Sequence, residues 1–280
     1  MSNKITPFIS AAAAAAFFAA PALAESIGKP IHGGMALQPA ATSLARDVHF
    51  LDSLVNWIIG GIVILVVTLL AIVIFRFSAK RNPVPARFTH HAALEIAWTG
   101  IPIAILMVIG AFSLPVLYNQ LTIPDAEVTL KATGNQWYWS YDYPDEEISF
   151  DALMLQKDEL EENGYAADEY LLAADTAVVV PVDTNVHVLV TASDVIHSWA
   201  MPAFGVKMDA VPGRLNEFWF NADTIGTYFG QCSELCGENH AYMPITVKVV
   251  SAEDYQAWLE TTRLAQGLPP RADIKIAAAE

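Results

Sequence analysis

This sequence has very few cysteines, and its basic residues are half as many as its acidic ones. It has only 2 Cys in 280 residues, which excludes a scaffold held by several disulfides and a zinc site built from four cysteines. Lys and Arg number 15 against 30 Asp and Glu, giving a formal net charge of −15. We therefore expect no nucleic acid as a partner, and a basic protein is the more plausible one.

Charged residues are also few, at 16% against 54% hydrophobic residues, so part of the chain is expected in a lipid bilayer. Two uncharged stretches, at about 55–75 and 96–117, have the length that a helix needs to cross ~30 Å of hydrocarbon. The intervening loop, 76–94, carries four basic residues, Arg76, Lys80, Arg81 and Arg87. The positive-inside rule places this loop in the cytoplasm and both ends of the hairpin outside.

The first residues have the form of a secretory signal peptide. Lys4 precedes an apolar block, and Ala22-Leu23-Ala24 supplies small residues for cleavage before Glu25. A third membrane helix stays possible, but the apolar stretch is short. The predicted organisation is a signal peptide at 1–24, a periplasmic segment at 25–49, a membrane hairpin at 50–118, a periplasmic domain at 119–266 and a tail at 267–280.

The pattern of the predicted periplasmic domain indicates an all-β unit with a strong negative charge. From Asn119 onward there are 26 acidic and 8 basic residues, a net charge of 8 − 26 = −18. Alternating or β-branched runs predict strands at 128–133, 136–143, 176–182, 186–191, 217–221, 227–230 and 245–250. Many short strands indicate a sandwich or barrel. The acidic stretch 158–170 is expected to be a helical or mobile insertion, and 253–266 a helix.

One loop between two predicted strands, 230–244, concentrates the chemistry. Cys232, Cys236, His240 and Met243 follow one another at offsets of four, four and three. Soft thiolate and thioether ligands together with imidazole favour copper, and a weakly bound Met is typical of copper electron-transfer sites. His197, predicted to follow a strand and precede a loop, can supply a second imidazole from elsewhere in the sandwich.

The second cysteine distinguishes this loop from a mononuclear blue-copper site, which needs only one. Two thiolates can bridge two copper ions, each with one terminal imidazole, while Met243 and a backbone carbonyl such as that of Glu234 bind weakly. The alternative is a disulfide between Cys232 and Cys236 in a membrane-anchored structural or assembly subunit without redox metal. A disulfide gives no reason for His240 and Met243 at these spacings, so copper is favoured.

Four segments together resemble cytochrome c oxidase subunit 2. They are CSELCGENHAYM at 232–243, DVIHSW at 194–199, QWYWSY at 136–141 and KMDAVPGR at 207–214. The resemblance implies a bacterial inner-membrane protein with a two-helix hairpin and a cupredoxin-like Greek-key domain. Its dinuclear copper A centre would accept electrons from cytochrome c and pass them to haem a of the catalytic subunit, which reduces oxygen to water and pumps protons.

The resemblance also implies roles for individual residues. Trp137 would be the surface residue through which electrons arrive, and Glu95 the acid at the mouth of a proton path, although Glu95 can equally favour a helix N-terminus. The implied copper ligands are His197, Cys232, Cys236, His240, Met243 and the carbonyl of Glu234, whose carboxylate would bind a magnesium or manganese ion shared with the catalytic subunit. The candidate docking acids are Asp142, Asp145, Glu146, Glu147 and Asp194.

Two related families fit the sequence less well. Quinol oxidases lose the copper ligands, which are all present here, and nitrous oxide reductase requires a propeller domain for which this chain is too short. The sequence shows no nucleophile–base pair, phosphate-binding loop or haem-attachment motif. Oxygen chemistry is therefore expected in a partner subunit, within a complex that includes further oxidase subunits and the bilayer.

Overall fold

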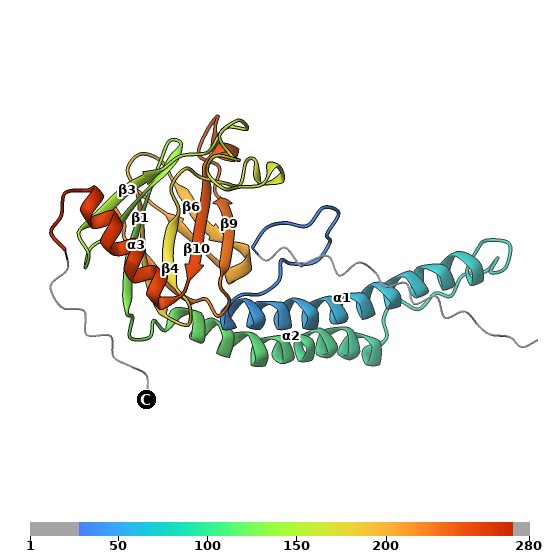
Figure 1. Cartoon of the computed structure of the whole chain (residues 1–280). Helices are drawn as coiled ribbons and strands as arrows, with labels where there is room; N and C mark the ends of the chain where they lie inside the picture. Colours follow the sequence, from blue (N-terminus) through green and yellow to red (C-terminus); the bar gives the residue numbers. More distant parts are fainter. Residues whose placement is uncertain (1–27, 271–280) are drawn as a thin grey trace, which may run out of the picture.

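The computed structural model describes residues 28–270, which form a long helical hairpin joined to a β-sandwich (Figure 1). The predicted signal peptide, 1–24, and residues 271–280 of the predicted tail lie outside the described residues. A two-helix hairpin followed by an all-β domain confirms the predicted fold class.

The hairpin consists of α1 (Ser43–Arg76) and α2 (Ala92–Leu121), each long and apolar enough to cross a membrane. Helix α1 begins well before the predicted span because Thr42 caps it, its side chain accepting a hydrogen bond from the backbone of Ala45. The Thr42 hydroxyl also donates to the carbonyl of Phe204 at 2.8 Å, and Leu44 and Ala45 are buried. The first turn of α1 is thus fixed to the sandwich, which holds the hairpin against the outer domain.

Two five-stranded sheets form the sandwich, in the orders β3-β2-β1-β5-β8 and β4-β10-β9-β6-β7. The pairs β1–β5 and β4–β10 are parallel, and the other neighbours are antiparallel. The strands are β1 (Val128–Asn135), β2 (Tyr138–Tyr143), β3 (Ile148–Ala152), β4 (Val178–Pro181), β5 (Asn185–Ala192), β6 (His197–Met201), β7 (Val206–Ala210), β8 (Asn216–Asn221), β9 (Gly226–Cys232) and β10 (Pro244–Val250).

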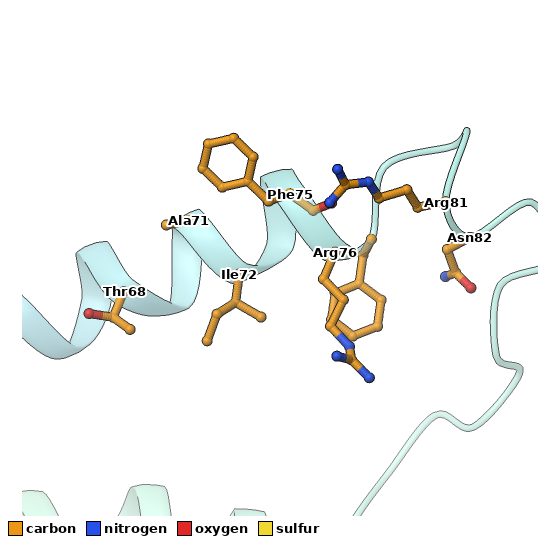
Figure 2. Close-up of a pocket in the computed structure, with 8 residues that line it drawn as sticks. Thr68, Ala71, Ile72, Phe75, Arg76, Arg81 and Asn82 are labelled. Carbon is orange, nitrogen blue, oxygen red and sulfur yellow. The ribbon is translucent and has the colours of Figure 1, made fainter.

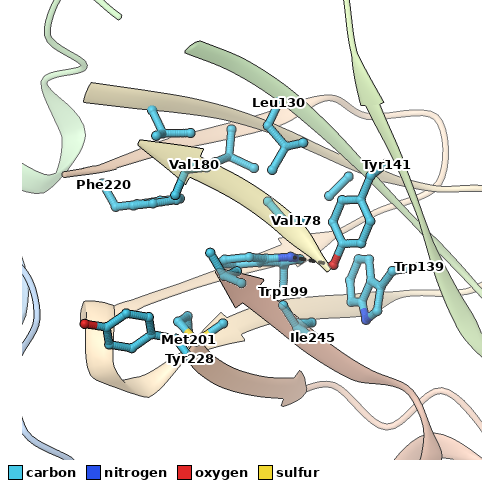
Figure 3. Packing of buried hydrophobic residues seen from close by; sticks show 14 of the residues in the cluster. Leu130, Trp139, Tyr141, Val178, Val180, Trp199, Met201, Phe220, Tyr228 and Ile245 are labelled. Atoms are coloured by element: carbon cyan, nitrogen blue, oxygen red, sulfur yellow. Dashed lines mark hydrogen bonds between the residues drawn. The ribbon is translucent and has the colours of Figure 1, made fainter. Parts of the chain in front are cut away.

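The core between the sheets is filled by large aromatic and β-branched side chains (Figure 3). Strands β1 and β5 alternate buried and half-buried residues, as expected for strands with one face on the core. The buried Trp199 donates its indole N–H to the Tyr141 hydroxyl at 3.2 Å, so the polar ends of both rings are satisfied across the two sheets. This rigid core lies directly beneath the cysteine loop, because Cys232, Cys236 and Met243 belong to the same cluster.

Three strands were absent from the sequence prediction: β3, β6 and β7. Strand β6 matters most, because it corrects the placement of His197. This residue follows β5, as predicted, but it begins a strand where a loop was predicted. Its pattern, HSWAM, is almost wholly buried and therefore lacks the alternation that identifies half-buried strands. The predicted 136–143 strand also begins later, since Gln136 and Trp137 form a turn between β1 and β2.

The acidic stretch 158–170 is ordered mainly by turns, with a short 3-10 helix, η1 (Ala167–Glu169). It has a small apolar cluster of its own that includes Leu160 and Tyr165. Lys29 of the N-terminal segment contacts Asp168 at 3.0 Å and Glu169 at 3.1 Å. Helix α3 (Ala252–Ala265) covers the flank near the predicted position.

Candidate metal centre

Strand pairing brings the cysteine loop and His197 together. Cys232 ends β9 and pairs with β6 opposite Trp199, two residues beyond His197. Strand β10 returns antiparallel to β9, with Pro244 opposite Gln231, so the loop from Cys232 to Met243 is closed by the sheet at both ends. Although 35 residues separate His197 from Cys232, the two side chains lie on one end of this sheet.

Five side chains converge at that end. The ligand atoms of His197, Cys232 and Cys236 all lie within 4.8 Å of one another, and the three residues are buried. Nδ1 of His197 is 3.9 Å from Sγ of Cys232. On the other side, Sγ of Cys236 is 3.6 Å from Nδ1 of His240 and 3.6 Å from Sδ of Met243. Each thiol therefore faces one imidazole nitrogen.

The two thiols are free in the structure, with their sulfurs 3.9 Å apart. A disulfide bond is about 2.0 Å long, so no disulfide joins Cys232 and Cys236 in this conformation. At this separation the sulfurs are close to van der Waals contact without being bonded, so both can bind the same metal ion, and the disulfide alternative is disfavoured for this conformation.

The thiols differ in acidity. Burial tends to raise the pKa of Cys232, but hydrogen bonds with His197 and with the backbone at Glu234 and Ser198 outweigh it and lower this pKa to about 7. Burial and the adjacent Cys232 charge raise the pKa of Cys236 to about 12. Without metal, the pair consequently keeps one proton through neutral and mildly alkaline pH.

Asp194 orients the imidazole of His197. Its Oδ1 lies 2.9 Å from Nε2 of His197 and also accepts the backbone N–H of Val195 at 2.6 Å. A carboxylate only accepts, so Nε2 is the donor, and in the neutral ring this leaves the lone pair of Nδ1 facing the thiols. Burial tends to lower the pKa of His197, but its bonds to Cys232 and Asp194 raise it overall. Asp194 was predicted as a docking acid, and the structure gives it a bond to a candidate ligand.

The backbone carbonyl and the side-chain carboxylate of Glu234 have different surroundings. Its carbonyl oxygen lies 3.3 Å from Sγ of Cys232, close to the thiols. The residue as a whole is exposed, as is its neighbour Leu235. The carboxylate is therefore accessible to a group outside this chain.

Trp137 lies over the loop in the turn between β1 and β2. It is partly buried against the core, and a methyl group placed on Gly237 would come within 3.1 Å of its Cζ2. The following aromatic residues alternate as predicted, with Trp139, Tyr141 and Tyr143 buried and Tyr138 half-buried. Trp139 packs edge-on to His197, with ring centroids 6.1 Å apart.

The other docking candidates are not equivalent. Asp145 and Glu147 are exposed, and Asp142 is half-buried, with its carboxylate 3.2 Å from Nζ of Lys131. Glu146 contradicts the expectation of a surface acid, since only 7% of it is exposed and its backbone carbonyl accepts a hydrogen bond from the buried Arg263. Its carboxylate lies 3.9 Å from the Arg263 guanidinium, so carbonyl and carboxylate both connect the β2–β3 turn to α3, and the side chain is not available to a partner protein.

Glu95 is exposed in the first turn of α2, at the end of the hairpin away from the sandwich (Figure 1). Its carboxylate oxygen lies 3.4 Å from the backbone nitrogen of His91, the N-cap residue. This contact agrees with the interpretation that Glu95 stabilises the N-terminus of α2, and it leaves the carboxylate accessible. A proton-path role depends on another chain and stays a prediction.

A surface hollow of about 730 Å³ lies far from the thiols, near the end of α1 that leads into the interhelical loop (Figure 2). It is lined by Arg76 and Arg81 together with apolar side chains such as Phe75. Guanidinium groups do not ligate metal cations, so this hollow is no part of the candidate centre.

Sequence reasoning missed two residues at the centre. Gln136 donates its side-chain N–H to the carbonyl of Cys236 at 2.8 Å. Gly237 has φ = +126° and lies against both Gln136 and Trp137. A glycine directly after the second cysteine was a usable signal for a close approach, whereas nothing in the sequence distinguished Gln136 from a surface residue.

Comparison with known proteins covers most of the chain. The family model for the periplasmic domain of cytochrome C oxidase subunit II matches residues 128–250, and that for its transmembrane domain matches residues 30–116. Cytochrome c oxidase subunit 2 of Cereibacter sphaeroides is 57% identical over 253 residues, which cover 85% of this chain and 84% of that protein. A probable cytochrome c oxidase subunit 2 of Rickettsia bellii is 44% identical over 232 residues, covering 82% and 85%.

Among solved structures, the periplasmic domain of subunit II of cytochrome oxidase from Bradyrhizobium japonicum is similar. It is 50% identical, with a TM-score of 0.47, covering 51% of this chain and 99% of that one.

Proposed function

This chain belongs to the cytochrome c oxidase subunit II family, and from this premise we propose that it accepts electrons from cytochrome c at a dinuclear copper A centre. It passes them to haem a of the catalytic subunit, where oxygen is reduced to water and protons are pumped. The observation that carries the proposal is the convergence of buried thiol and imidazole groups from β6 and the β9–β10 loop.

The donor set fits copper. Thiolates, imidazoles and a thioether are soft or borderline ligands, and the thioether of Met243 has no role in a typical zinc site. Cys232 and Cys236 would hold the two ions together with the imidazoles, because each sulfur lies near the other sulfur and near one imidazole nitrogen. Two copper ions held there would share one electron and so supply a one-electron carrier.

The terminal ligands follow from the same contacts. His197 and His240 would bind through Nδ1, Met243 through its sulfur, and Glu234 through its carbonyl oxygen. The exposed carboxylate of Glu234 would bind a magnesium or manganese ion shared with the catalytic subunit, since such hard cations prefer oxygen ligands.

Electrons would arrive through Trp137, which lies in contact with the loop that carries Cys236. Cytochrome c would be steered by acidic side chains, a long-range effect that raises the association rate. Asp142, Asp145 and Glu147 keep this proposed role. Asp194 combines it with orientation of His197, and Glu146 is excluded because it is buried.

The hairpin would place the sandwich on the periplasmic side of the bacterial inner membrane, after removal of the signal peptide 1–24. Its contacts would be with lipid, with the catalytic subunit and with other oxidase subunits. Glu95, at the cytoplasmic end of α2, would stand at the mouth of a proton path into the catalytic subunit.

Copper stoichiometry combined with electron paramagnetic resonance tests the proposal. The full-length chain, purified in detergent, is reduced and then loaded with copper. Two coppers per chain and one unpaired electron split by both nuclei are expected, and Cys236→Ser should lose that shared signal. A Cys232–Cys236 disulfide that re-forms and prevents loading after reduction would instead support the structural alternative.

A further inference from the structure

The turn that carries Trp137 is attached to the candidate centre at two separate points. Gln136 and Trp137 connect β1 to β2 between the paired residues Asn135 and Tyr138. One attachment passes through Asp194 to His197, and the other passes through the Gln136 side chain to Cys236. The turn is therefore tied to two of the three residues whose ligand atoms cluster most tightly.

Asp194 divides its carboxylate between the two sides. Oδ1 accepts the Nε2–H of His197 at 2.9 Å, and Oδ2 accepts the backbone N–H of Gln136 at 2.7 Å. A single rigid carboxylate thus fixes the distance between a candidate ligand and the residue directly before Trp137. Hydrogen bonds to a charged acceptor are roughly twice as strong as neutral ones.

The Gln136 side chain reaches across to the cysteine loop. Its Nε2 donates to the carbonyl of Cys236 at 2.8 Å. The next residue, Gly237, has no side chain, and this lets Gln136 and the Trp137 ring lie directly on the loop. A methyl group there would be 3.1 Å from Nε2 of Gln136 and 3.1 Å from Cζ2 of Trp137.

Trp137 itself makes no hydrogen bond that could fix its ring. Its indole nitrogen is inaccessible and has no hydrogen-bond partner within residues 28–270. The ring orientation consequently depends on its packing against Gly237 and on the two attachments of the turn. Breaking one attachment removes one of these three restraints on the position of the ring relative to Cys236.

We infer that Gln136 and Asp194 are positioning residues, which form one hydrogen-bonded link holding the Trp137 indole at a fixed place relative to Cys236 and His197. The inference rests on the proposed electron-transfer function and gives Gln136 and Asp194 a role that is separate from any contact with the donor protein. The link sets the electronic contact between Trp137 and the ligand loop, whereas the surface acids set the encounter with cytochrome c.

Gln136→Met tests the link, because it keeps the side-chain length and removes the donor. Gln266→Met is the matched control: its Nε2 also donates to a backbone carbonyl at 2.8 Å, that of Ser149, far from the loop. Electron uptake from reduced cytochrome c is followed by rapid mixing in the assembled oxidase, at several donor and salt concentrations.

For Gln136→Met we expect the saturated uptake rate to fall about tenfold, within the usual effect of losing an outer-shell partner. The donor concentration at half-saturation and the salt dependence should stay unchanged, because docking is intact. Asp194→Asn should lower the same rate and also alter the copper hyperfine pattern, since it changes the partner of His197. Gln266→Met should behave as the unchanged protein.

A second measurement needs no copper. In the metal-free full chain, the fluorescence of Trp137, obtained by subtraction of a Trp137→Phe background, should become more accessible to acrylamide in Gln136→Met. Unchanged accessibility, or a changed accessibility with an unchanged uptake rate, overturns the positioning role. A parent chain that binds no dinuclear copper refutes the proposed function instead, and the quenching result then still decides whether the link holds the ring.

Discussion

Replacing Gly237 with alanine examines the contact between Trp137 and the cysteine loop most directly. Gly237 has φ = +126°, a backbone conformation that alanine rarely adopts, and such strain costs about 1–3 kcal/mol. The added methyl group would also lie 3.1 Å from Cζ2 and 3.4 Å from Nε1 of Trp137, so the ring or the loop must shift by a few tenths of an ångström. We expect a loss of about 2 kcal/mol in the free energy of unfolding, the middle of that range.

For a domain of this size, such a loss lowers the unfolding temperature by about 4–8 °C. Gly213→Ala is the matched control, since Gly213 has φ = +75° but no atom within 4 Å of the added methyl group. It should show the backbone strain without the contact, a loss of about 1 kcal/mol at the low end of the same range. Thermal unfolding of the metal-free full chain, followed by near-ultraviolet circular dichroism, measures the difference between the two variants. Electron uptake in the assembled oxidase should fall only in Gly237→Ala. Equal unfolding temperatures and equal uptake rates for both variants would refute the packing of Trp137 on this loop.

Four further predictions concern the centre and its support. Trp137→Ala should slow electron uptake and leave copper content intact, as measured by rapid mixing and metal analysis; normal uptake would contradict its role. Met243→Leu should shift the reduction potential in a potentiometric titration while copper stays bound. Loss of both coppers would show that Met243 binds more strongly than proposed. In the metal-free reduced chain, alkylation followed by mass spectrometry should show one thiol, Cys232, ionising at about pH 7 and Cys236 only at much higher pH. Because the pKa of Cys232 is lowered by folding, its stabilising effect is present above the ordinary value of about 8.5 and is lost as pH falls through about 7; a single midpoint near 8.5 would contradict this. Arg263→Met should destabilise the fold by about 3–5 kcal/mol in denaturant unfolding, since it removes the cation of a buried ion pair whose other member, the Glu146 carboxylate, lies 3.9 Å away; a change below about 1 kcal/mol, typical of an exposed pair, would contradict its buried role.

The sequence was most informative where one short segment carries several requirements at once. One loop carries four candidate copper ligands at regular offsets: Cys232, Cys236, His240 and Met243. These candidates could therefore be predicted from the sequence alone. The same holds for the two membrane-length apolar helices, because length and lack of charge are local properties.

Burial and pairing were harder to predict. Strand β6 was missed because a strand buried on both faces shows no alternation. Glu146 reads as one of several acids in a surface turn, yet it is buried beside Arg263, which is more than one hundred residues away in the chain. Neither error could be corrected from local composition.

By itself, the sequence determined the membrane hairpin, the all-β outer domain and the soft-ligand loop. Hydropathy, alternation and residue spacing are local properties, so they can be recognised without knowing how the chain folds. Only the tertiary structure decided that Asp194 orients His197 and that Gln136 holds the loop at Cys236. The Gln136 bond joins residues 100 positions apart, and the bond between Asp194 and His197 joins near neighbours whose directions depend on the turn between them. Their geometry exists only after β6 and β9 have paired in one sheet and β1 has packed against them from the other sheet.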